Sequence, residues 1–388
     1  MAGWSKEKRL RTEKAFYQFL DNAYVFSKER GRFCVGKELY DGQRRVISEI
    51  FDALEDDVHD IYILKSRQLG MSTIIRLLTT FLAGLNPGLN GAIVFDDDKN
   101  RVKARTELVN VISELPAKLK FPGIAKDNRY SLILKNKAEM LFLAAGVRKT
   151  KSTGGLGRSA GLSFLHASEM CSWGDTDGVE ALKQSLAESN DDRLYIWEST
   201  ARGFNIWYDM WQEAKRDKGH CRTIFLGWWA KQSQRIPRTH RDFAIYGSQE
   251  PTKDEKKKIE AVWKQYGVQI DQEQLAWVRR KYDPTARPDN DNTEVEYEAS
   301  TSRVQEQPWT EEDAFQQSGA IFFSNEKLTD QSAKHVSKKY SSWMFLVGQE
   351  FVDMRVLRAE NMKSVELKVW EEPVEDATYA LGCDPAYG

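Results

Sequence analysis

A short basic loop between two apolar runs has the residue types of a phosphate-binding site. It lies between the runs 61–64 and 74–82 and consists of Lys65, Ser66, Arg67, Gln68, Leu69, Gly70, Met71, Ser72 and Thr73. A strand, a tight glycine-containing loop and a helix that begins at a hydroxyl residue together aim backbone N–H groups and a helix dipole at an anion. The pattern predicts a site for nucleotide phosphates. The alternative is an unrelated strand-to-helix turn with a basic edge.

The loop lacks a cation at the position where one is usually found. Lysine normally stands directly before the hydroxyl residue and reaches the β- and γ-phosphates, but here this position is Met71. Methionine carries no charge, so Lys65 or Arg67 must supply the cation if the loop binds ATP. A lysine at the front of the loop can fold its stem over the backbone and bring its ammonium group to the same oxygens. Ser72 would then offer its hydroxyl to Mg²⁺.

A second apolar run ends in an acid that could activate water. Residues 162–165 lead through a short polar stretch to Ser168 and Glu169, and an ATPase needs a carboxylate near the phosphates to orient the attacking water. The position before this carboxylate is normally an aspartate that supports Mg²⁺. The hydroxyl of Ser168 can hydrogen-bond a magnesium-bound water but adds no charge. The alternative for Glu169 is that it caps the N-terminus of a helix.

Two further loops extend this set of candidates. The apolar run 194–197 leads to hydroxyl residues where loss of the γ-phosphate could be sensed, and we predict a coupling role for Ser199, Thr200 and Ala201. A basic, glycine-rich loop at 147–158 could contact DNA phosphates or place an arginine against the nucleotide of a neighbouring subunit. Its candidate DNA contacts are Arg148, Lys149 and Lys151. A solvated loop is the alternative.

Strand-length apolar runs that alternate with helix-like stretches must position these groups. The runs are 61–64, 91–95, 162–165, 194–197 and 223–226. This alternation predicts an α/β fold with a mostly parallel sheet that is covered on both faces. Two more runs, at 131–134 and 140–144, indicate a β-hairpin inserted in the sheet.

The segments on either side of the sheet region have a different composition. Residues 5–51 are charged with interspersed aromatic residues, and they predict helices. From about Lys231 the chain becomes more polar, and we expect 253–258 and 284–296 to be helix-poor or solvated. Strand character returns in 352–388. The composition therefore predicts a sheet-containing core with an appended segment.

Composition excludes several classes of protein. The 388 residues are 41% hydrophobic and 30% charged, which is typical of a globular protein with room for two domains. No apolar stretch is long enough to span a bilayer and no apolar signal core is present, so we expect a cytoplasmic protein. The four cysteines form no C-x-x-C pair, which argues against a zinc or disulfide framework. The net charge of −1 means that any DNA contact needs local basic patches.

Taken in order, these motifs resemble the large terminase subunit of tailed phages. The most specific match is 199–211, which is similar to the family's coupling motif and the aromatic helix after it. Residues 66–70 resemble its phosphate loop, in which some members carry the lysine at the front, and Ser168 and Glu169 fall at its Walker B acid pair. The resemblance implies a P-loop ATPase core of the ASCE or RecA-like type with a small lid, using ATP and Mg²⁺. Met71 and Ser168 depart from the family pattern at catalytic positions.

The resemblance assigns roles to residues outside the phosphate loop. Residues 39–43 are similar to the family's adenine motif, in which Gln43 would pair with the adenine edge and Tyr40 would pack against the base. Arg158 falls where the family has an arginine that acts across a subunit boundary. A DNA-facing role is its alternative.

The C-terminal part resembles the end of the family's ATPase region and the start of its nuclease. Residues 308–315, followed by Ser318 and Gly319, resemble the closing segment of the ATPase. Residues 379–388 resemble the first strand of an RNase H-like nuclease, with Asp384 as its first metal-binding carboxylate. A two-metal nuclease needs several converging carboxylates. We therefore expect a truncated chain that does not cleave DNA, since a nuclease site for Mg²⁺ or Mn²⁺ would need the complete domain.

The resemblance covers 35–388 in motif order, with no motif between 230 and 307, and it implies four parts. These are an N-terminal helical segment at 1–38 that packs with the lid, the ATPase core at 39–230, a lid and linker at 231–330, and a linker with the start of the nuclease at 331–388. The boundaries follow the changes in composition.

The implied function is ATP-driven packaging of double-stranded viral DNA. The implied partners are DNA, the portal protein, the small terminase subunit and further copies of the chain in a ring, with a monomer in isolation. The ring would act at the procapsid portal in the host cytoplasm and would not be part of the mature virion. One alternative is a superfamily 2 helicase or translocase, which would need a second RecA-like domain. The other is a nucleotide-binding assembly module with impaired hydrolysis.

Overall fold

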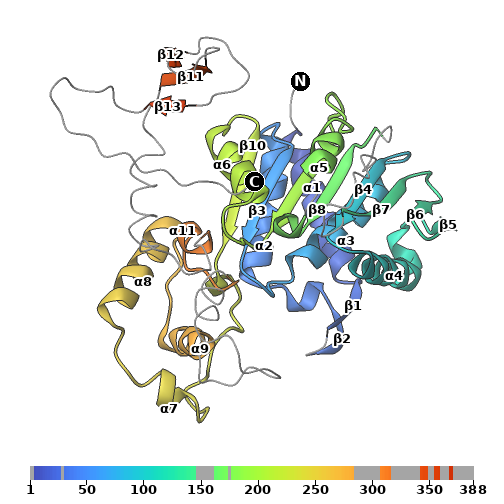
Figure 1. Cartoon of the computed structure of the whole chain (residues 1–388). Coiled ribbons are helices and arrows are strands. Elements are labelled where there is room, and N and C mark those ends of the chain that lie inside the picture. The colour runs from blue at the N-terminus through green and yellow to red at the C-terminus, as the bar shows by residue number, and fades with distance from the viewer. Residues whose placement is uncertain are drawn as a thin grey trace. The chain divides into compact units, whose positions relative to one another are not determined.

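The computed structural model describes residues 4–27, 30–145, 161–173, 176–283 and 306–315, together with three short strands between 341 and 369 (Figure 1). Residues up to Ala320 form one compact unit, and residues from Ile321 form another. The phosphate loop and the acid strand both lie in the first unit.

Among the described residues, the centre of the first unit is an eight-stranded sheet. Its spatial order is β10 (Cys221–Leu226), β3 (Asp60–Lys65), β9 (Leu194–Ser199), β8 (Phe164–Ser168), β4 (Asn90–Phe95), β7 (Glu139–Ala144), β6 (Ser131–Leu134) and β5 (Ile124–Asp127). The first six strands are parallel, and β6 and β5 are antiparallel. Strands β3, β4, β8 and β9 are buried along nearly their whole length, which requires cover on both faces. The predicted α/β fold with a mostly parallel sheet is confirmed.

The strand order brings the candidate strand ends together. β9 separates β3, which leads into the phosphate loop, from β8, which leads to Glu169. Parallel strands have their carboxyl ends at one edge of a sheet, and ligands of open α/β sheets bind at this edge. Lys65, Glu169 and Ser199 therefore start from neighbouring positions.

Two details of the sheet differ from the prediction. β8 runs from Phe164 to Ser168, whereas the predicted run was 162–165. Leu162 makes only an isolated bridge to Leu186, and the polar end of β8 belongs to the strand because its side chains have buried partners. The predicted hairpin is confirmed as β6 and β7, but β5 extends it by one strand.

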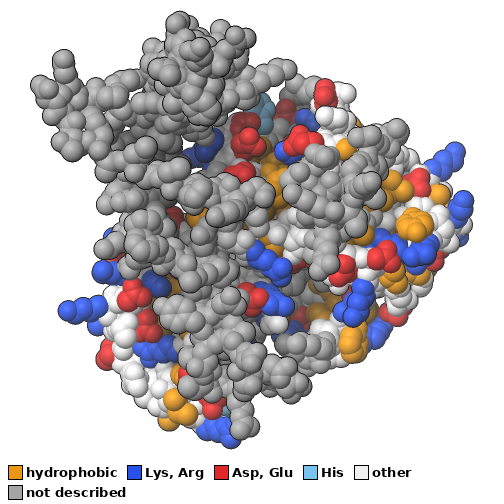
Figure 2. Space-filling view, in the orientation of Figure 1, with side chains coloured by type: hydrophobic (Ala, Val, Ile, Leu, Met, Phe, Trp, Pro, Cys, Tyr) orange, Lys and Arg blue, Asp and Glu red, His pale blue; other side chains and the backbone are white. Residues whose placement is uncertain are grey.

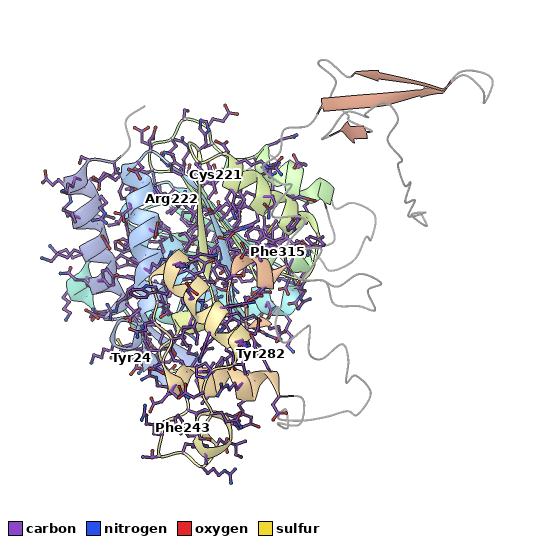
Figure 3. The ribbon with its side chains drawn as sticks, turned by 90° about the vertical axis from the view of Figure 1, so that its left-hand side faces the viewer. Tyr24, Cys221, Arg222, Phe243, Tyr282 and Phe315 are labelled. Atoms are coloured by element: carbon purple, nitrogen blue, oxygen red, sulfur yellow. The ribbon has the colours of Figure 1, made fainter. Side chains whose placement is uncertain are left out.

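Amphipathic helices cover the sheet. α2 (Asp41–Glu55) buries residues at helical spacing, among them Val46, Ile47, Ile50 and Phe51. α3 (Met71–Leu85) is apolar around most of its surface and largely buried. The other core helices are α4 (Asp98–Glu114), α5 (Thr176–Lys183) and α6 (Ile206–Arg216). Arg222, at the start of β10, forms ion pairs with Glu49 and Asp56 and so joins this edge strand to α2 (Figure 3).

The N-terminal segment contains a hairpin that the sequence did not predict. Residues 5–51 are not helical throughout, because a hairpin of β1 (Tyr24–Ser27) and β2 (Gly31–Cys34) and the 3-10 turn η1 (Gly36–Glu38) separate α1 (Lys6–Leu20) from α2. Aromatic and β-branched residues in 24–26 favour a strand. α1 packs against α2 and α3. The cause is its aromatic face, where Phe16 contacts Phe51 and Phe81.

The lid is more helical than its polar sequence predicted. It contains α7 (Phe243–Tyr246), α8 (Lys253–Tyr266), α9 (Gln272–Tyr282) and, after a gap in the described residues, α11 (Glu311–Ala314). The run 253–258, which was expected to be helix-poor, opens α8. A capping box of Thr252 and Glu255 satisfies the first N–H groups of this helix, and Lys258 and Lys264 pair with acids one turn earlier. The run 284–296 lies outside the described residues.

Tryptophans attach the lid to the core. Trp228, in the 3-10 turn η4 (Trp228–Ala230) after β10, stacks on Trp277 of α9 and meets Trp309 edge to face. The indole N–H of Trp229 donates to the carbonyl of Trp309 at 3.0 Å. The segment 306–315 thus returns from the lid to the core and lies beside the strand that borders β3.

The second unit is described only by the backbone of three strands. β11 (Ser341–Val347) lies between β12 (Met354–Arg358) and β13 (Leu367–Val369) in an antiparallel sheet. The strand predicted at 379–388, with Asp384, lies outside the described residues, as do Ser318 and Gly319. None of the helices in the described ranges has the length and apolar character needed to cross a membrane.

Candidate active site

The loop after β3 has the backbone of an anion-binding turn. Gln68 and Gly70 both adopt left-handed conformations, with φ of +64° and +66°. Gly70 is the N-cap of α3 and no side chain caps this helix end, so the first N–H groups of α3 lack intrahelical partners. Ser72 and Thr73 stand in the first turn. The predicted combination of loop, glycine and hydroxyl residues is present, and its helix end carries the partial positive charge that favours phosphate.

Lys65 points across the sheet edge to the acid. Its ammonium nitrogen donates to Glu169 Oε1 at 2.9 Å, and its side chain is only 6% exposed. Burial alone would lower the pKa of Lys65, but the carboxylates of Glu169 and Glu198 outweigh this effect and raise the pKa above its usual value. The buried ammonium group is therefore charged at neutral pH. It is held at the strand ends, beside the turn that leads to Ser72.

Glu169 occupies a strained turn directly after β8. Its φ is +57°, a conformation that costs a residue with a side chain roughly 1–2 kcal/mol. It is the N-cap residue of the 3-10 turn η3 (Met170–Ser172), which agrees in position with the predicted alternative, but its side chain makes no capping hydrogen bond. The carboxylate instead accepts from Lys65 and is one third exposed. A strained, partly exposed acid at a strand end is suited to contact a ligand.

The other loop residues divide between the core and a neighbouring segment. Met71 is buried with 1% exposure, so its side chain takes part in core packing. The Ser66 hydroxyl donates to Gln307 Oε1 at 2.8 Å. Arg67 forms an ion pair with Glu306, and its backbone N–H donates to the Glu306 carbonyl at 3.0 Å. Of the two candidate cations, Lys65 is thus the one directed at the strand ends, and Arg67 is bound to the segment that returns from the lid.

Glu198 is a buried carboxylate that the sequence did not single out. It lies on β9 in register with Ser168 on β8 and has 0% exposure. Burial alone would raise the pKa of Glu198, but the Lys65 ammonium, the His166 side chain and, to a smaller degree, the nearby Ser72 hydroxyl outweigh burial and lower the pKa to about 2. The signal that could have identified it is an acid inside an apolar strand next to Ser199. The same signal is typical of an ordinary surface acid at a strand end.

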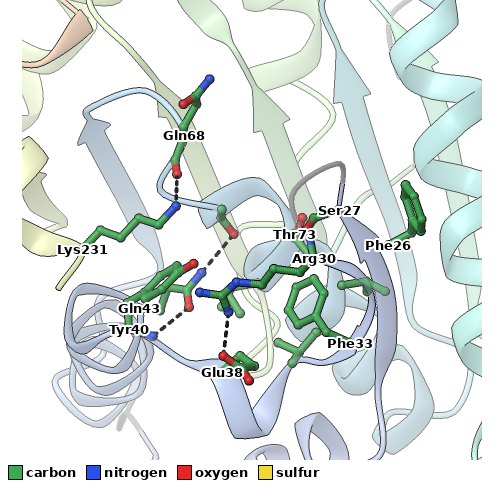
Figure 4. Close-up of a pocket in the computed structure, with 14 residues that line it drawn as sticks. Phe26, Ser27, Arg30, Phe33, Glu38, Tyr40, Gln43, Gln68, Thr73 and Lys231 are labelled. Atoms are coloured by element: carbon green, nitrogen blue, oxygen red, sulfur yellow. Dashed lines mark hydrogen bonds and ion pairs between the residues drawn. The ribbon is translucent and has the colours of Figure 1, made fainter. Parts of the chain in front are cut away.

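Two cavities adjoin the phosphate loop. One, of about 290 Å³, is lined by Ser72, Thr73, Ser168 and Glu169 among others, and so it lies between the first turn of α3 and the acid. The other, of about 260 Å³, lies between the loop and the β1–β2 hairpin (Figure 4). The first cavity is the more polar one and adjoins the predicted magnesium and water positions. The second is less polar and adjoins the hairpin.

The less polar cavity has the residues expected for a base. Its lining includes Tyr40, Phe33 and Ile74, as well as Gln43 and Gly70. Arg30 reaches over from the hairpin, where its guanidinium lies 5.6 Å from the centre of the Tyr40 ring. The hairpin residues and Lys231, which also lines the cavity, were missed because no sequence pattern connects them with the loop.

The amide of Gln43 is engaged with the phosphate loop. Its Nε2 donates to the carbonyl of Leu69 at 3.1 Å, and its Oε1 accepts from the backbone N–H of Tyr40 at 3.1 Å. Gln43 therefore ties the start of α2 to the phosphate loop. The adenine contact expected for Gln43 would have to use the second lone pair of its carbonyl oxygen or replace one of these bonds.

Ser199, Thr200 and Ala201, for which we predicted a coupling role, lie beside the acid turn. The Ser199 hydroxyl accepts from the backbone N–H of Cys171, two residues after Glu169, at 2.9 Å. Thr200 is buried and has its hydroxyl 3.6 Å from the Cys171 sulfur, and Ala201 is buried beside it. Tyr208 of the nearby α6 meets Phe315 edge to face.

The predicted DNA-facing loop lies outside the described residues. This applies to Arg148, Lys149, Lys151 and Arg158. On the face shown in Figure 2, the described Lys and Arg side chains are interspersed with Asp and Glu. This mixture accords with the net charge of −1.

No known sequence family and no curated protein matches the chain. Solved structures give distant similarities. The large terminase of bacteriophage HK97 has 16% identity and a TM-score of 0.45, over 69% of this chain and 51% of that protein. The large terminase ATPase domain of Thermus phage P74-26 has 16% identity and a TM-score of 0.35, over 44% of this chain and 76% of that domain. The large terminase of a thermophilic bacteriophage, solved in complex with ADP, has 14% identity and a TM-score of 0.37, over 49% of this chain and 45% of that protein.

Proposed function

We propose that this chain is the ATP-hydrolysing motor domain of a viral DNA-packaging enzyme of the terminase large-subunit type. The observation that supports this most directly is the convergence of a buried cation, Lys65, a strand-end acid, Glu169, and a helix start with Ser72 at one sheet edge. A cation paired with an acid, and a helix N-terminus that shares a cavity with this acid, are groups that phosphoryl transfer from a nucleotide needs. The similarities to solved terminase structures are too distant to support the proposal, which depends on the site residues alone.

In this proposal each group acts on a defined part of ATP. Lys65 and the N–H groups at the start of α3 bind the β- and γ-phosphates, while Glu169 orients the attacking water. Water forms a bond to the γ-phosphorus as the bond to the β,γ-bridging oxygen breaks, which yields ADP and phosphate. Magnesium, when bound with the nucleotide, neutralises charge on the phosphate oxygens. Ser72 would hold it directly, and Ser168 would contact it through water.

The base would occupy the cavity beneath the β1–β2 hairpin. A volume of about 260 Å³ is ample for an adenine ring, and Tyr40 offers an aromatic face for stacking. Gln43 would read the adenine edge while still bonded to the loop. This would make nucleotide binding sensitive to the position of α2.

Ser199, Thr200 and Ala201 would transmit hydrolysis to the lid. A movement of the acid turn shifts the Cys171 N–H that Ser199 accepts. α6 follows and contacts α11, where Lys215 and the Trp211 indole both bond to Glu311. The force on DNA would then come from a shift of the lid segment relative to the sheet.

The partners and location belong to the same proposal. Double-stranded DNA, the portal protein, the small terminase subunit and a homo-oligomeric ring at the procapsid portal in the host cytoplasm are expected for a packaging motor. Arg148, Lys149 and Lys151 would contact DNA, and Arg158 would face DNA or a neighbouring nucleotide. Asp384 would begin an RNase H-like nuclease that needs further carboxylates for Mg²⁺ or Mn²⁺ before it can cleave DNA.

The rival functions predict different outcomes. A superfamily 2 helicase has two RecA-like sheets, and the described part of the chain contains one mostly parallel sheet and two small antiparallel ones. An assembly module would bind nucleotide without turnover, and a buried Met71 would agree with this. The pairing of Lys65 with Glu169 favours hydrolysis, because it supplies the missing cation next to the acid.

The proposal is tested by magnesium-dependent ATP turnover of the full chain with double-stranded DNA, with single-stranded DNA and without DNA. We expect turnover that double-stranded DNA stimulates more than single-stranded DNA. Strand separation of a DNA duplex would favour the helicase. Tight ATP binding with no turnover, in the presence of DNA and partner proteins, would favour the assembly module and contradict the motor.

A further inference from the structure

The proposed magnesium site lacks an acid on its usual strand. P-loop ATPases hold the ion with the loop hydroxyl and with an aspartate at the strand end that precedes the catalytic acid, and this position is Ser168. Mg²⁺ prefers oxygen ligands, and its protein sites commonly use one or two carboxylates besides phosphates and waters. A neutral hydroxyl leaves the positive charge of the ion without a protein counter-charge on this strand.

We propose that Glu198, on the neighbouring strand β9, supplies the missing carboxylate and holds a magnesium-bound water in place of an acid at position 168. The inference rests on the function proposed above and specifies how the same site binds its metal. The register of the two strands makes the substitution geometrically simple, because Ser168 and Glu198 are Cα partners across the parallel pair. The carboxylate of Glu198 would thus lie one strand away from the position where the acid is usually found.

One oxygen of Glu198 is fixed by β8. Oε1 accepts from the Ser168 hydroxyl at 2.9 Å and from His166 Nε2 at 3.2 Å. A carboxylate can only accept, so both neighbours must donate, and His166 carries its proton on Nε2. These two bonds orient the carboxylate group within the sheet edge.

The other oxygen of Glu198, Oε2, is buried without a hydrogen-bond partner among the described residues, although a fully buried carboxylate normally has both oxygens satisfied. The nearby Ser72 hydroxyl, which helps to lower the pKa of Glu198, belongs to the residue that would hold magnesium. A metal-bound water between Ser72 and Glu198 would donate to Oε2 and satisfy it.

A buried cation, Lys65, compensates part of the negative charge of Glu198. The buried Lys65 ammonium is the strongest charge acting on this carboxylate and favours its ionised form. Ser72 and Ser168 line the same cavity. A purely structural acid would be expected to have both of its carboxylate oxygens satisfied.

The test measures how much magnesium strengthens nucleotide binding. The dissociation constant of a fluorescent ADP analogue is measured in MgCl₂ and in EDTA, for the wild type and for Glu198→Gln, which keeps the shape and removes the charge. We expect the magnesium enhancement to fall by about tenfold or more, as for other outer-shell partners of metal ions. Affinity in EDTA should stay the same or increase, because Lys65 loses a competitor for the phosphates.

Two further variants separate a metal role from a structural one. Ser168→Asp combined with Glu198→Gln returns the carboxylate to the usual strand, and it should restore most of the magnesium enhancement. Asp60→Asn is the matched control, since Asp60 is a partly buried acid at the opposite end of β3, and it should leave the enhancement at the wild-type value. If thermal unfolding shows that Glu198→Gln does not fold, Glu198→Asp, which retains the charge but withdraws it, should show the same selective loss.

The outcomes distinguish this inference from the proposed function. A folded Glu198→Gln protein with wild-type magnesium enhancement would overturn the inference and leave the nucleotide site intact. Equal weakening in MgCl₂ and in EDTA, with no rescue by Ser168→Asp, would show a purely structural role. A wild-type chain that binds no nucleotide under either condition would reject the proposed function itself, and this inference with it.

Discussion

The Lys65 ammonium group lies 2.9 Å from the carboxylate of Glu169, so the cation at the front of the loop and the acid at the end of β8 are direct partners. A triphosphate carries more negative charge than one carboxylate and would compete for Lys65. We infer that ATP binding draws the ammonium group to the phosphates and frees Glu169 to orient water. The same contact would then keep the acid inactive until nucleotide arrives.

Glu169→Gln should separate binding from hydrolysis. The amide keeps the side-chain shape but is a poor partner for the attacking water, so kcat should fall by about 10²–10⁴-fold, while affinity for ATP stays the same or rises. A phosphate-release assay measures kcat, and a nucleotide titration measures the affinity for ATP. Glu180→Gln, at an exposed acid on α5, is the control and should leave both unchanged. Loss of binding together with hydrolysis would contradict a role specific to water.

Gly70→Ala should weaken nucleotide binding beyond its effect on stability. Gly70 has φ of +66°, and a Cβ there would lie 3.0 Å from Gln43 Nε2. We expect a loss of roughly 1–2 kcal/mol in unfolding free energy from the left-handed backbone, and weaker ADP binding because the Gln43 tether must move. Gly88 has φ of +73° with open space around it, so Gly88→Ala carries similar strain without the contact. Equal ADP affinity in the two variants would argue against the loop geometry described above.

Gln307→Ala should destabilise the protein through the phosphate loop. It removes one acceptor of the buried Ser66 hydroxyl, Gln307 Oε1 at 2.8 Å, and leaves the Glu306 carbonyl at 3.0 Å as the other. We therefore expect a loss of about 0.5–1.5 kcal/mol in unfolding free energy. Urea unfolding followed by tryptophan fluorescence measures the change. Gln232→Ala removes an exposed hydrogen bond to Asp41 and should have a much smaller effect. If the two variants unfold alike, the segment at 306–307 does not hold the loop.

The lid should show an acid-dependent loss of stability at Glu255. A hydrogen bond from Arg279, at 2.7 Å, lowers the pKa of Glu255 below 4.5, against the effect of burial. Because the folded-state pKa lies below that of the unfolded chain, the stabilisation is complete above the unfolded pKa and is lost as pH falls through the folded one. Glu255→Gln should therefore lower the unfolding free energy at about pH 7 and have little effect at about pH 3. A difference that is independent of pH would contradict the ion pair.

Much of the sheet could be predicted from the sequence because buried parallel strands leave strong local signals. Exposure of apolar runs such as 91–95 and 194–197 to water is unfavourable, and each forms a buried strand. The hairpin at 24–34 and the charged helix α8 were not predicted, because their burial depends on which neighbours they meet. α8 buries Val262 fully and is otherwise mostly exposed, so its apolar signal is weak.

The site was only partly predictable for a related reason. Lys65, Ser72 and Glu169 follow a pattern of spacing along the chain, so their types and positions identified them. Glu198 acts across strands, and its significance depends on the register with Ser168, which no local pattern encodes. The contact of Arg67 with Glu306 joins residues 239 positions apart in the sequence, so no local pattern could have predicted it.

The most direct test of the account compares the two candidate cations. ATP turnover is measured with saturating magnesium for Lys65→Ala and Arg67→Ala, with thermal unfolding to show that both fold. Because the Lys65 ammonium is buried beside Glu169 and Arg67 is half exposed beside Glu306, Lys65→Ala should lower kcat by about 10²–10³-fold, and Arg67→Ala should lower it by only a few-fold. Full turnover in a folded Lys65→Ala protein would contradict the claim that this lysine replaces the missing cation of the loop.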